Sequence, residues 1–383
     1  MRWKLELRKR IKNVAGLENF FPLYEEEKLW FQKTGGAVSN DTVSTDSISN
    51  GAISNRAASK SQTPSQEAPP FAFRVTPYFL SRAGKKIDDP IRRQCVPLDS
   101  ELHCQRGEIV DPLGDQARMK VPRLVHRYHD RALLLVTDEC AVNCRYCFRR
   151  YYASGGRGPI RGNELKAACS YLKAHREIHE LILSGGDPLT LDDSKLFEII
   201  DVLREARPGL ILRVSTRIPS ALPSRVTRRL ARGLALRQPL WGVLHINHAQ
   251  ELSEDCSAAI HRLVSTGIPL VSQTVLLAGI NSDEAVLEEL FRGLIARGVK
   301  PYYLFQADLA EGTSGFRVPI RRGQQIMKAL RSRLSALALP DYAVDLPAGG
   351  GKVPLTPSYE TGEDADSVFF ENIEGKRSAY PKI

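Results

Sequence analysis

The chain has 383 residues, of which 42% are hydrophobic and 26% charged, and its formal net charge is +10. These values are ordinary for a soluble globular protein with a sizeable core. No stretch approaches the roughly 20 uncharged apolar residues of a membrane span, and the N-terminus lacks the apolar core of a secretory signal. A cytoplasmic protein without a membrane partner is therefore expected. The seven cysteines do not suggest a disulfide framework and fit a reducing compartment.

The positive charge predicts no particular partner. Several arginines crowd one expected helix, namely Arg225, Arg228, Arg229, Arg232 and Arg237. No nucleic-acid-binding motif accompanies them, so we expect a solvated basic helix face and no nucleic-acid partner.

Three regions precede the expected catalytic domain. Residues 1–31 mix large apolar side chains with charges, which predicts one or two amphipathic helices. Residues 32–70 contain no aromatic residue and are dominated by Ser, Asn, Thr, Ala and Gly, which predicts a low-complexity linker or insertion. Order is expected to resume at Phe71, in an accessory region over residues 71–123.

A repeating unit follows over residues 124–340. Short β-rich runs are expected at 132–137, 180–184, 210–215, 240–247, 268–277 and 301–306, and helices at about 162–176, 192–206, 223–236, 253–266, 283–297 and 319–337. Alternating βα units predict a parallel sheet with right-handed crossovers, either open and doubly wound or curled towards a barrel. Polar residues follow each strand, which places the chemistry at one rim of the sheet.

Cys140, Cys144 and Cys147 form a C-x3-C-x2-C motif directly after the first of these strands. Three closely spaced thiolates without an obvious fourth suit a [4Fe-4S] cluster in which one iron stays open to an outside ligand. The alternatives are a structural zinc site, which requires a fourth ligand at matching spacing, and three thiols that are merely buried.

This motif after a strand resembles the radical S-adenosylmethionine (SAM) superfamily, and Phe148, Arg149 and Arg150 make the chain similar to the lysine 2,3-aminomutase family within it. The resemblance implies an α/β fold, an incomplete barrel of six βα units with an N-terminal helical extension. It also implies that the open iron binds SAM and reduces it to a 5′-deoxyadenosyl radical. An electron donor such as flavodoxin or ferredoxin is then a required partner.

Gly185, Gly186 and Asp187 lie at the second strand end, where glycine allows a close backbone approach to a ligand and a carboxylate accepts hydrogen bonds from an ammonium. Without context this is a tight turn before a helix. By resemblance it is the segment that holds the amino group of SAM. The same pocket is implied for Thr216, Arg217, His245 and Gln273.

Lys352 follows three glycines in PAGGGK. A P-loop is ruled out because Leu346 and Val353 stand where its pattern requires Gly and Ser or Thr, and most such lysines lie at the surface. In the similar family the matching lysine carries pyridoxal 5′-phosphate (PLP), on a C-terminal segment that corresponds to residues 341–383. The resemblance further implies that Arg127, Tyr128 and Arg131 contact this cofactor, and that the end of the chain covers the barrel mouth.

The resemblance also implies the substrate contacts. Arg149 matches the residue that binds the substrate carboxylate, and Asp308 and Asp345 match the two aspartates that receive the distal ammonium of lysine. Two enclosed carboxylates repel each other unless a cation joins them. The expected reaction is therefore the isomerisation of L-lysine to β-lysine. Open alternatives are arginine, the lysine destined for a translation factor, or a radical SAM enzyme without PLP, and a homo-oligomer is compatible with each.

Overall fold

The computed structural model describes residues 2–35, 70–153, 155–372 and 375–382. Most of the expected linker over 32–70 lies outside these residues. The first described segment forms three helices where one or two were expected, α1 (Arg2–Arg8), α2 (Val14–Glu18) and α3 (Glu25–Lys33). The accessory region adds α4 (Pro77–Ser81) and α5 (Pro90–Cys95). A buried ion pair joins α3 to α5, because Arg92 Nε donates to Glu27 Oε1 at 2.7 Å.

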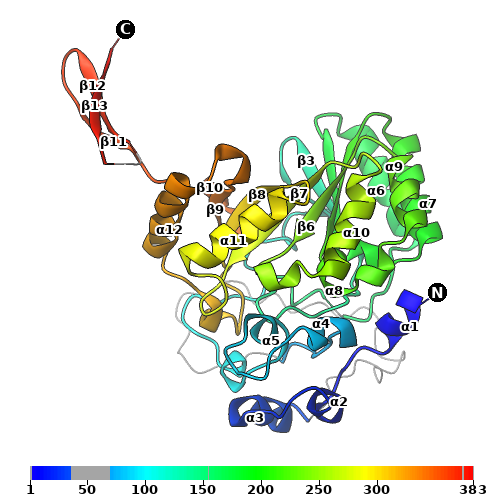
Figure 1. Cartoon of the computed structure of the whole chain (residues 1–383). Helices are drawn as coiled ribbons and strands as arrows, with labels where there is room; N and C mark the ends of the chain where they lie inside the picture. Colours follow the sequence, from blue (N-terminus) through cyan, green and yellow to red (C-terminus); the bar gives the residue numbers. More distant parts are fainter. Residues whose placement is uncertain (1, 36–69, 154, 373–374, 383) are drawn as a thin grey trace.

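The expected βα repeat is confirmed as a curved, largely parallel sheet (Figure 1). All six predicted strands form, and a seventh parallel strand that was not predicted from the sequence follows them. The seven are β3 (Arg131–Thr137), β4 (Glu180–Gly185), β5 (Ile211–Thr216), β6 (Leu240–His245), β7 (Leu270–Leu276), β8 (Val299–Gln306) and β9 (Asp341–Leu346).

Antiparallel strands flank this series at both ends, so the sheet runs in one order from β1 to β10. They are β1 (Met119–Val121), β2 (Leu124–Tyr128) and β10 (Gly351–Pro354). The segment between residues 109 and 118 spans the gap between the two ends: Ile109 N donates to Leu309 O at 2.9 Å, and Ala348 N donates to Pro112 O at 3.0 Å. The barrel is therefore incomplete as a sheet and is bridged by a loop.

Helices cover one face of the sheet. They are α6 (Gly162–Ala174), α7 (Asp193–Ala206), α8 (Ile218–Ala221), α9 (Arg228–Ala235), α10 (Glu254–Val264), α11 (Glu284–Ile295) and α12 (Ile320–Arg333). The longer ones are amphipathic, as α11 shows by burying Leu287, Leu290, Phe291 and Leu294 at helical spacing. Short 3₁₀ turns complete the connections, at Asp99–Leu102, Pro188–Thr190, Pro223–Arg225, Ala249–Glu251, Ser314–Phe316, Ala336–Ala338 and Pro347–Gly349.

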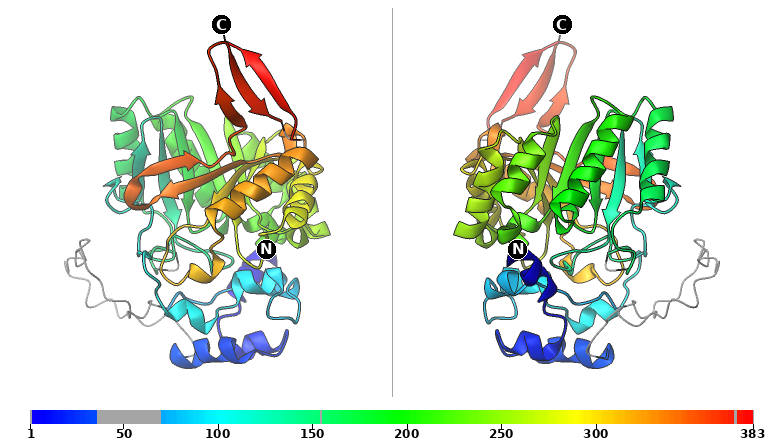
Figure 2. Two further views of the ribbon diagram at one scale, coloured as in Figure 1. Left: turned by 90° about the vertical axis from the view of Figure 1, so that its left-hand side faces the viewer. Right: turned by 90° about the vertical axis from the view of Figure 1, so that its right-hand side faces the viewer.

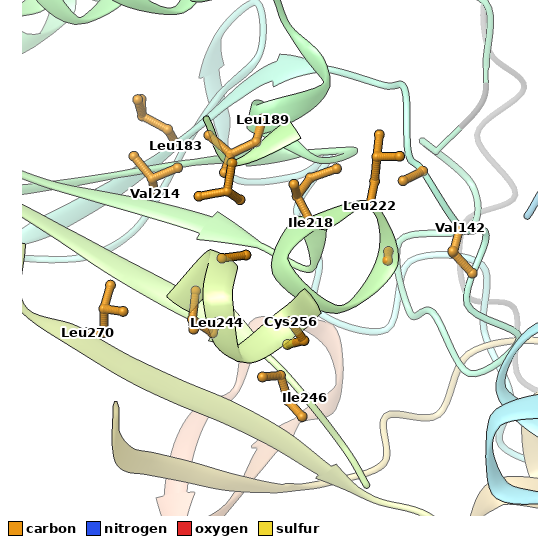
Figure 3. Close-up of a cluster of buried hydrophobic side chains, with 14 of the residues drawn as sticks. Val142, Leu183, Leu189, Val214, Ile218, Leu222, Leu244, Ile246, Cys256 and Leu270 are labelled. Atoms are coloured by element: carbon orange, nitrogen blue, oxygen red, sulfur yellow. The ribbon is translucent and has the colours of Figure 1, made fainter. Parts of the chain in front are cut away.

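The core lies between the helices and the sheet. Val214, Leu244 and Leu270 from three neighbouring strands meet there and are almost fully buried (Figure 3). Along β7, buried residues alternate with half-buried ones, and the half-buried set includes Gln273. Because side chains alternate between faces along a strand, the half-buried set lies on the face without helices. That face is the interior of the incomplete barrel and holds the polar side chains described below.

Two expectations about charge and the C-terminus are wrong. Arg225 is fully buried rather than solvated, because its guanidinium binds Asp193 and the carbonyl groups of Leu189 and Leu191. The end of the chain does not cover the barrel mouth. It forms a separate antiparallel sheet that projects away from the barrel (Figure 2). Its strands are β11 (Glu360–Glu363), β12 (Ser367–Glu371) and β13 (Arg377–Pro381).

Candidate active site

The cysteine loop begins where β3 ends. Cys140, Cys144 and Cys147 are all unbridged and half-buried. Burial, and then the neighbouring thiols, raise the pKa of Cys140 well above its ordinary value and the pKa of Cys147 to about 11. Among the described residues, no three Cys, His, Asp or Glu side chains converge as a single metal ion would require. Three thiols that share one loop fit a cubane cluster instead, because each thiolate then binds a different iron.

Buried polar contacts fix this loop in place. Asn143 Nδ2 donates to Ala72 O at 2.8 Å, and Arg145 pairs with Glu101 at 2.8 Å, both within the protein interior. Asp138, fully buried, accepts hydrogen bonds from the backbone N–H groups of Arg157 and Gly158. The cysteine loop is therefore fixed by contacts with the accessory region, at residues 72 and 101, and by contacts with the segment that follows the loop, at residues 157 and 158.

Gly185 and Gly186 lie directly against the cysteine loop. Gly186 N donates to Thr137 O at 2.6 Å and Asp187 N donates to Glu139 O at 2.7 Å. A Cβ atom on Gly186 would lie 2.2 Å from Glu139 O, and one on Gly185 would lie 2.2 Å from Thr137 O. Both positions therefore require glycine, and the glycine pair is more than an ordinary tight turn.

Gly186→Ala is accordingly expected to destabilise the protein by about 1–3 kcal/mol, the usual cost of overpacking. It is also expected to lower the iron content, because the loop must move away from the new methyl group. Urea unfolding and iron analysis test both effects. Gly162→Ala is the matched control, since a Cβ atom added there would have no atom within 4 Å. Equal behaviour of the two variants would contradict the contact.

Asp187 connects the ends of β4 and β5. Its buried carboxylate accepts from Thr216 Oγ1 at 2.7 Å, from Arg217 N at 2.7 Å and from Leu189 N at 3.0 Å. Burial raises its pKa in spite of these donors. In this structure Asp187 positions the neighbouring strand ends, and its contact with an outside ammonium stays a prediction.

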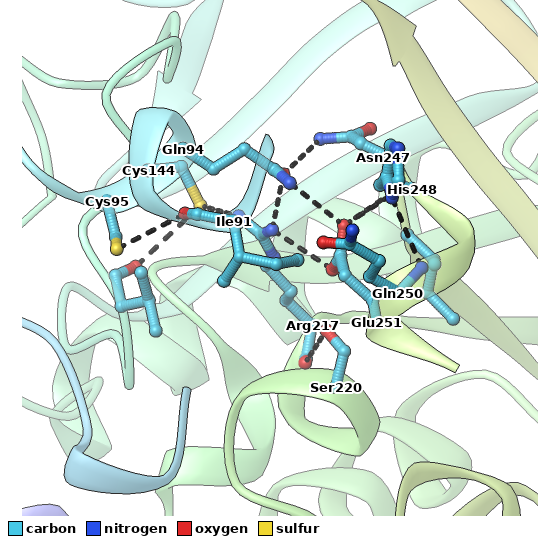
Figure 4. A network of polar contacts seen from close by, with 12 residues as sticks. Ile91, Gln94, Cys95, Cys144, Arg217, Ser220, Asn247, His248, Gln250 and Glu251 are labelled. Carbon is cyan, nitrogen blue, oxygen red and sulfur yellow. Dashed lines mark hydrogen bonds and ion pairs between the residues drawn. The ribbon is translucent and has the colours of Figure 1, made fainter. Parts of the chain in front are cut away.

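The Arg217 guanidinium lies against Cys144 of the cysteine loop (Figure 4). Its Nη1 donates to Cys144 Sγ at 2.7 Å, and its Nη2 donates to Gln94 Oε1 at 2.6 Å and to Glu251 Oε2 at 3.0 Å. The sequence placed Arg217 at the same rim but gave no sign of this buried network, because its partners come from distant segments.

His245, the last residue of β6, and Gln273, in the middle of β7, are neighbours because the ladder pairs their Cα atoms. Burial, then the positive charges of Arg217 and Arg149, lowers the pKa of His245 to about 4. The imidazole is therefore neutral near pH 7 and able to donate and accept hydrogen bonds. The structure brings both predicted residues to the same rim as the cysteine loop.

Lys352 lies on β10 directly opposite Asp345 of β9. Its Nζ donates to Asp345 Oδ2 at 2.7 Å and lies 3.8 Å from the ring centre of Phe305. Burial lowers the pKa of Lys352, and the charge of Asp345 offsets this only in part. A lysine that loses its proton readily is suited to form a covalent bond with a carbonyl group.

Two further predicted residues converge on the same aspartate from β2. Arg127 Nη2 forms an ion pair with Asp345 Oδ1, and Tyr128 OH lies 3.3 Å from that oxygen. The Arg131 guanidinium lies 4.2 Å from the ring centre of Tyr128. A lysine with two arginines and a tyrosine beside it suits an aldehyde that also carries a phosphate, so the residues present fit PLP.

Asp308 follows β8 and faces this group without a partner of its own. It is half-buried, and no hydrogen bond or ion pair to its carboxylate is found in the described part of the chain. Burial and then the charge of Asp345 raise its pKa from 3.8 to about 7. The site therefore contains one carboxylate already paired with cations and a second one that is open to a further cation.

Arg149 is held by a residue that no sequence motif singled out. Its Nε donates to Asp115 Oδ2 at 2.7 Å, and both side chains are nearly buried. Tyr151 OH lies 3.3 Å from the same oxygen. Asp115 comes from the loop that spans the gap in the sheet, a polar stretch with no periodicity that could have revealed it.

Asp115→Asn is expected to lower stability by about 3 kcal/mol, because it leaves the buried Arg149 cation without its counter-charge. Urea unfolding measures this loss. Tyr151→Phe removes only the longer hydrogen bond to Asp115 and is expected to cost about 1 kcal/mol. A loss for Asp115→Asn no larger than that for Tyr151→Phe would show that the ion pair contributes little.

An incomplete parallel barrel with a C-x3-C-x2-C loop at the carboxyl ends of its strands defines a radical SAM enzyme. The radical SAM superfamily model matches residues 134–290, and the lysine-2,3-aminomutase model matches residues 327–383. The chain belongs to the lysine 2,3-aminomutase family and is an isomerase, a radical SAM aminomutase. Membership of this superfamily implies a [4Fe-4S] cluster and SAM as cofactors, as the sequence predicted.

Two curated relatives are similar in sequence to this chain over nearly its full length. L-lysine 2,3-aminomutase of Acetoanaerobium sticklandii is 35% identical over 99% of this chain and 84% of the relative. The enzyme of the same name from Clostridium subterminale is 34% identical over 99% of this chain and 83% of the relative. Glutamate 2,3-aminomutase of Clostridioides difficile is also 34% identical, over 80% of this chain and 72% of the relative. None of the helices described in this structure is long and apolar enough to span a membrane.

Proposed function

We propose that the protein is an L-lysine 2,3-aminomutase, which isomerises L-lysine to β-lysine with PLP bound to Lys352. The observation that carries the proposal is the open carboxylate of Asp308 beside the paired carboxylate of Asp345. A second cation would lower the repulsion between them and favour the ionised form of Asp308. The distal ammonium of lysine is such a cation.

The contacts of Arg149 support a proposed orientation of the substrate in the site. The Arg149 guanidinium, fixed by Asp115, is suited to bind the substrate carboxylate through two parallel hydrogen bonds. The side chain of the substrate then runs towards Asp308 and Asp345. This arrangement argues against glutamate, whose distal carboxylate would meet two carboxylates. Two of the three curated relatives described above are named L-lysine 2,3-aminomutase, and a lysine substrate agrees with the negative charge of Asp308 and Asp345.

Each cofactor has a defined set of proposed ligands. The three loop cysteines would hold the cluster, and SAM would lie against Gly185, Gly186, Asp187, Thr216, His245 and Gln273, next to Arg217. Arg127, Tyr128, Arg131 and Lys352 would hold PLP. When bound, the cluster and SAM supply a hydrogen-abstracting radical, and PLP holds the migrating amino group. The protein contributes orientation and excludes water from the radical.

Substrate choice is tested with anaerobically reconstituted protein, SAM and a reductant. The protein is offered L-lysine, L-arginine and L-glutamate separately, and products are separated by chromatography. Rearrangement of lysine at the highest kcat/KM supports the proposal. Arginine would be the second candidate, since it also has a cationic end. Turnover of glutamate alone, or of none of the three, would refute the assignment of Asp308 and Asp345.

The PLP attachment is tested by borohydride reduction and peptide mapping. A pyridoxyl group on Lys352, and on no other lysine, is the expected result. A protein that contains the cluster and cleaves SAM, yet retains no PLP, would instead be a radical SAM enzyme of another type.

A further inference from the structure

The first basic residues of the chain lie against the cysteine loop. Arg10 Nη1 donates to Cys140 O, and the same guanidinium pairs with Glu139 at 2.8 Å. Arg10 is itself largely buried, whereas Arg8 and Lys9, which end the α1 segment, are exposed. The backbone of a cluster cysteine is therefore one side chain away from an exposed basic segment.

A cleft of about 230 Å³ opens at this place. Its lining includes Arg8 and Arg10 from the first segment, Thr137 at the end of β3, Glu139 of the cysteine loop, and Pro159. Arg157 and Arg161 stand two residues before and after Pro159, and both are exposed. Exposed basic residues therefore lie in, or within two residues of, two separate segments that line the cleft.

The positive charge around the cleft is not neutralised. The nearby acids already have partners: Glu139 binds Arg10, Asp192 binds Lys4 at 2.6 Å, and Glu164 binds Arg123 at 3.0 Å. By contrast, Arg8, Lys9, Arg157 and Arg161 form no ion pair with any described residue. A local excess of positive charge results, and it faces the solvent beside the cluster loop.

We propose that this basic cleft, which Arg8 lines and whose surroundings include Lys9, Arg157 and Arg161, is the docking surface for an acidic one-electron carrier protein that reduces the cluster. The inference rests on the radical SAM function, because only a bound cluster needs this electron. One electron passes from the reduced carrier to the oxidised cluster. The carrier is oxidised by one electron and the cluster charge falls from 2+ to 1+, with no bond formed or broken.

The location and the charge both favour electron transfer here. An acidic carrier is steered towards an excess of unpaired positive charge, which raises the association rate most strongly at low ionic strength. Once docked, it faces the loop that bears Cys140, with Arg10 lying between the surface and that residue. The basic cleft therefore serves both recognition and a short path to the cluster.

The test uses reconstituted full-length protein and reduced flavodoxin, an acidic carrier. One variant reverses two charges on the first segment, Arg8→Glu with Lys9→Glu, and a second reverses two on the other, Arg157→Glu with Arg161→Glu. The matched control is Lys173→Glu with Arg176→Glu, a pair of exposed residues at the opposite end of α6 from the cysteine loop. Anaerobic stopped-flow follows the loss of cluster absorption, and calorimetry measures flavodoxin binding.

At low salt, each docking variant is expected to bind flavodoxin at least about 10-fold more weakly than the wild type, and its cluster to be reduced by flavodoxin at least about 10-fold more slowly. Both differences should become small at high salt. The control is expected to match wild type. Dithionite, a small reductant, should reduce the cluster of every variant alike. Unchanged flavodoxin binding and reduction in both docking variants would overturn the proposal. Wild-type protein that dithionite cannot reduce would instead refute the cluster, and with it the proposed function.

Discussion

Replacement of Lys352 by alanine is expected to lower the rate of lysine rearrangement by at least about 10³-fold, as the loss of a covalent catalytic group does elsewhere. Lys352 is the half-buried amine of the site, its pKa lies below the ordinary value for lysine, and Asp345 holds it 2.7 Å away. Because Lys352 is the proposed attachment point of PLP, the absorption of bound PLP should also be lost. The measurements are turnover with SAM and reductant, and the visible spectrum after addition of PLP.

Two controls separate chemistry from folding in this experiment. Lys328→Ala removes an exposed lysine of α12 that pairs only with Glu371 among the described residues, and it should leave turnover unchanged. The cluster of Lys352→Ala should still cleave SAM, because the cysteine loop lies on a different strand end. Added methylamine should restore part of the activity by replacing the missing amine. Full turnover of Lys352→Ala without added amine would disprove its role.

Asp308→Asn is expected to raise the KM for lysine roughly 10- to 150-fold, since a hydrogen bond to a charged group contributes about 1.5–3 kcal/mol. Asparagine keeps the shape of the side chain and loses its charge. For the wild type, KM should fall as pH rises through about 7, because ionisation of Asp308 improves its attraction for the distal ammonium. In Asp308→Asn this pH dependence should disappear. Steady-state kinetics between pH 6 and 8 measure both effects.

The same carboxyl group predicts how stability depends on pH in the lysine-free protein. Its pKa is about 7 in the folded chain against an ordinary value of 3.8, so the folded state binds the proton more tightly than the unfolded state. Stability relative to Asp308→Asn is therefore highest at low pH and falls as pH rises from about 4 to about 7. A parallel pH dependence in the two proteins would show that Asp308 titrates normally.

Most of the barrel could be predicted from the sequence because its signals are local. Each strand from β3 to β8 is a short apolar run between turn residues, and the structure places each within a few residues of its predicted range. The cysteine spacing and the glycine pair of residues 185 and 186 are equally local. These patterns sufficed to place the chemistry at one rim of a parallel sheet.

Contacts made by distant segments could not be predicted in this way. The short β9 and β10 are not joined by a helix, so the sequence indicated Asp345 and Lys352 but not the ladder that pairs them. Arg225 belonged to a basic run typical of a solvated helix, yet a buried aspartate binds it. Asp115 and Arg10 lie in polar stretches whose partners are 34 and 130 residues away along the chain.

If Lys352 binds PLP and Asp345 binds the substrate, as proposed, the length of the β9–β10 hairpin links cofactor attachment to substrate choice. Lys352 and Asp345 project from the same face because they lie seven positions apart, with six residues between them across the turn. A single inserted or deleted residue would turn one of them to the opposite face and remove both properties together. Variants that exchange side chains on this hairpin but keep its length are therefore expected to retain the pairing of Lys352 with Asp345, whereas variants that change the length of the turn are not.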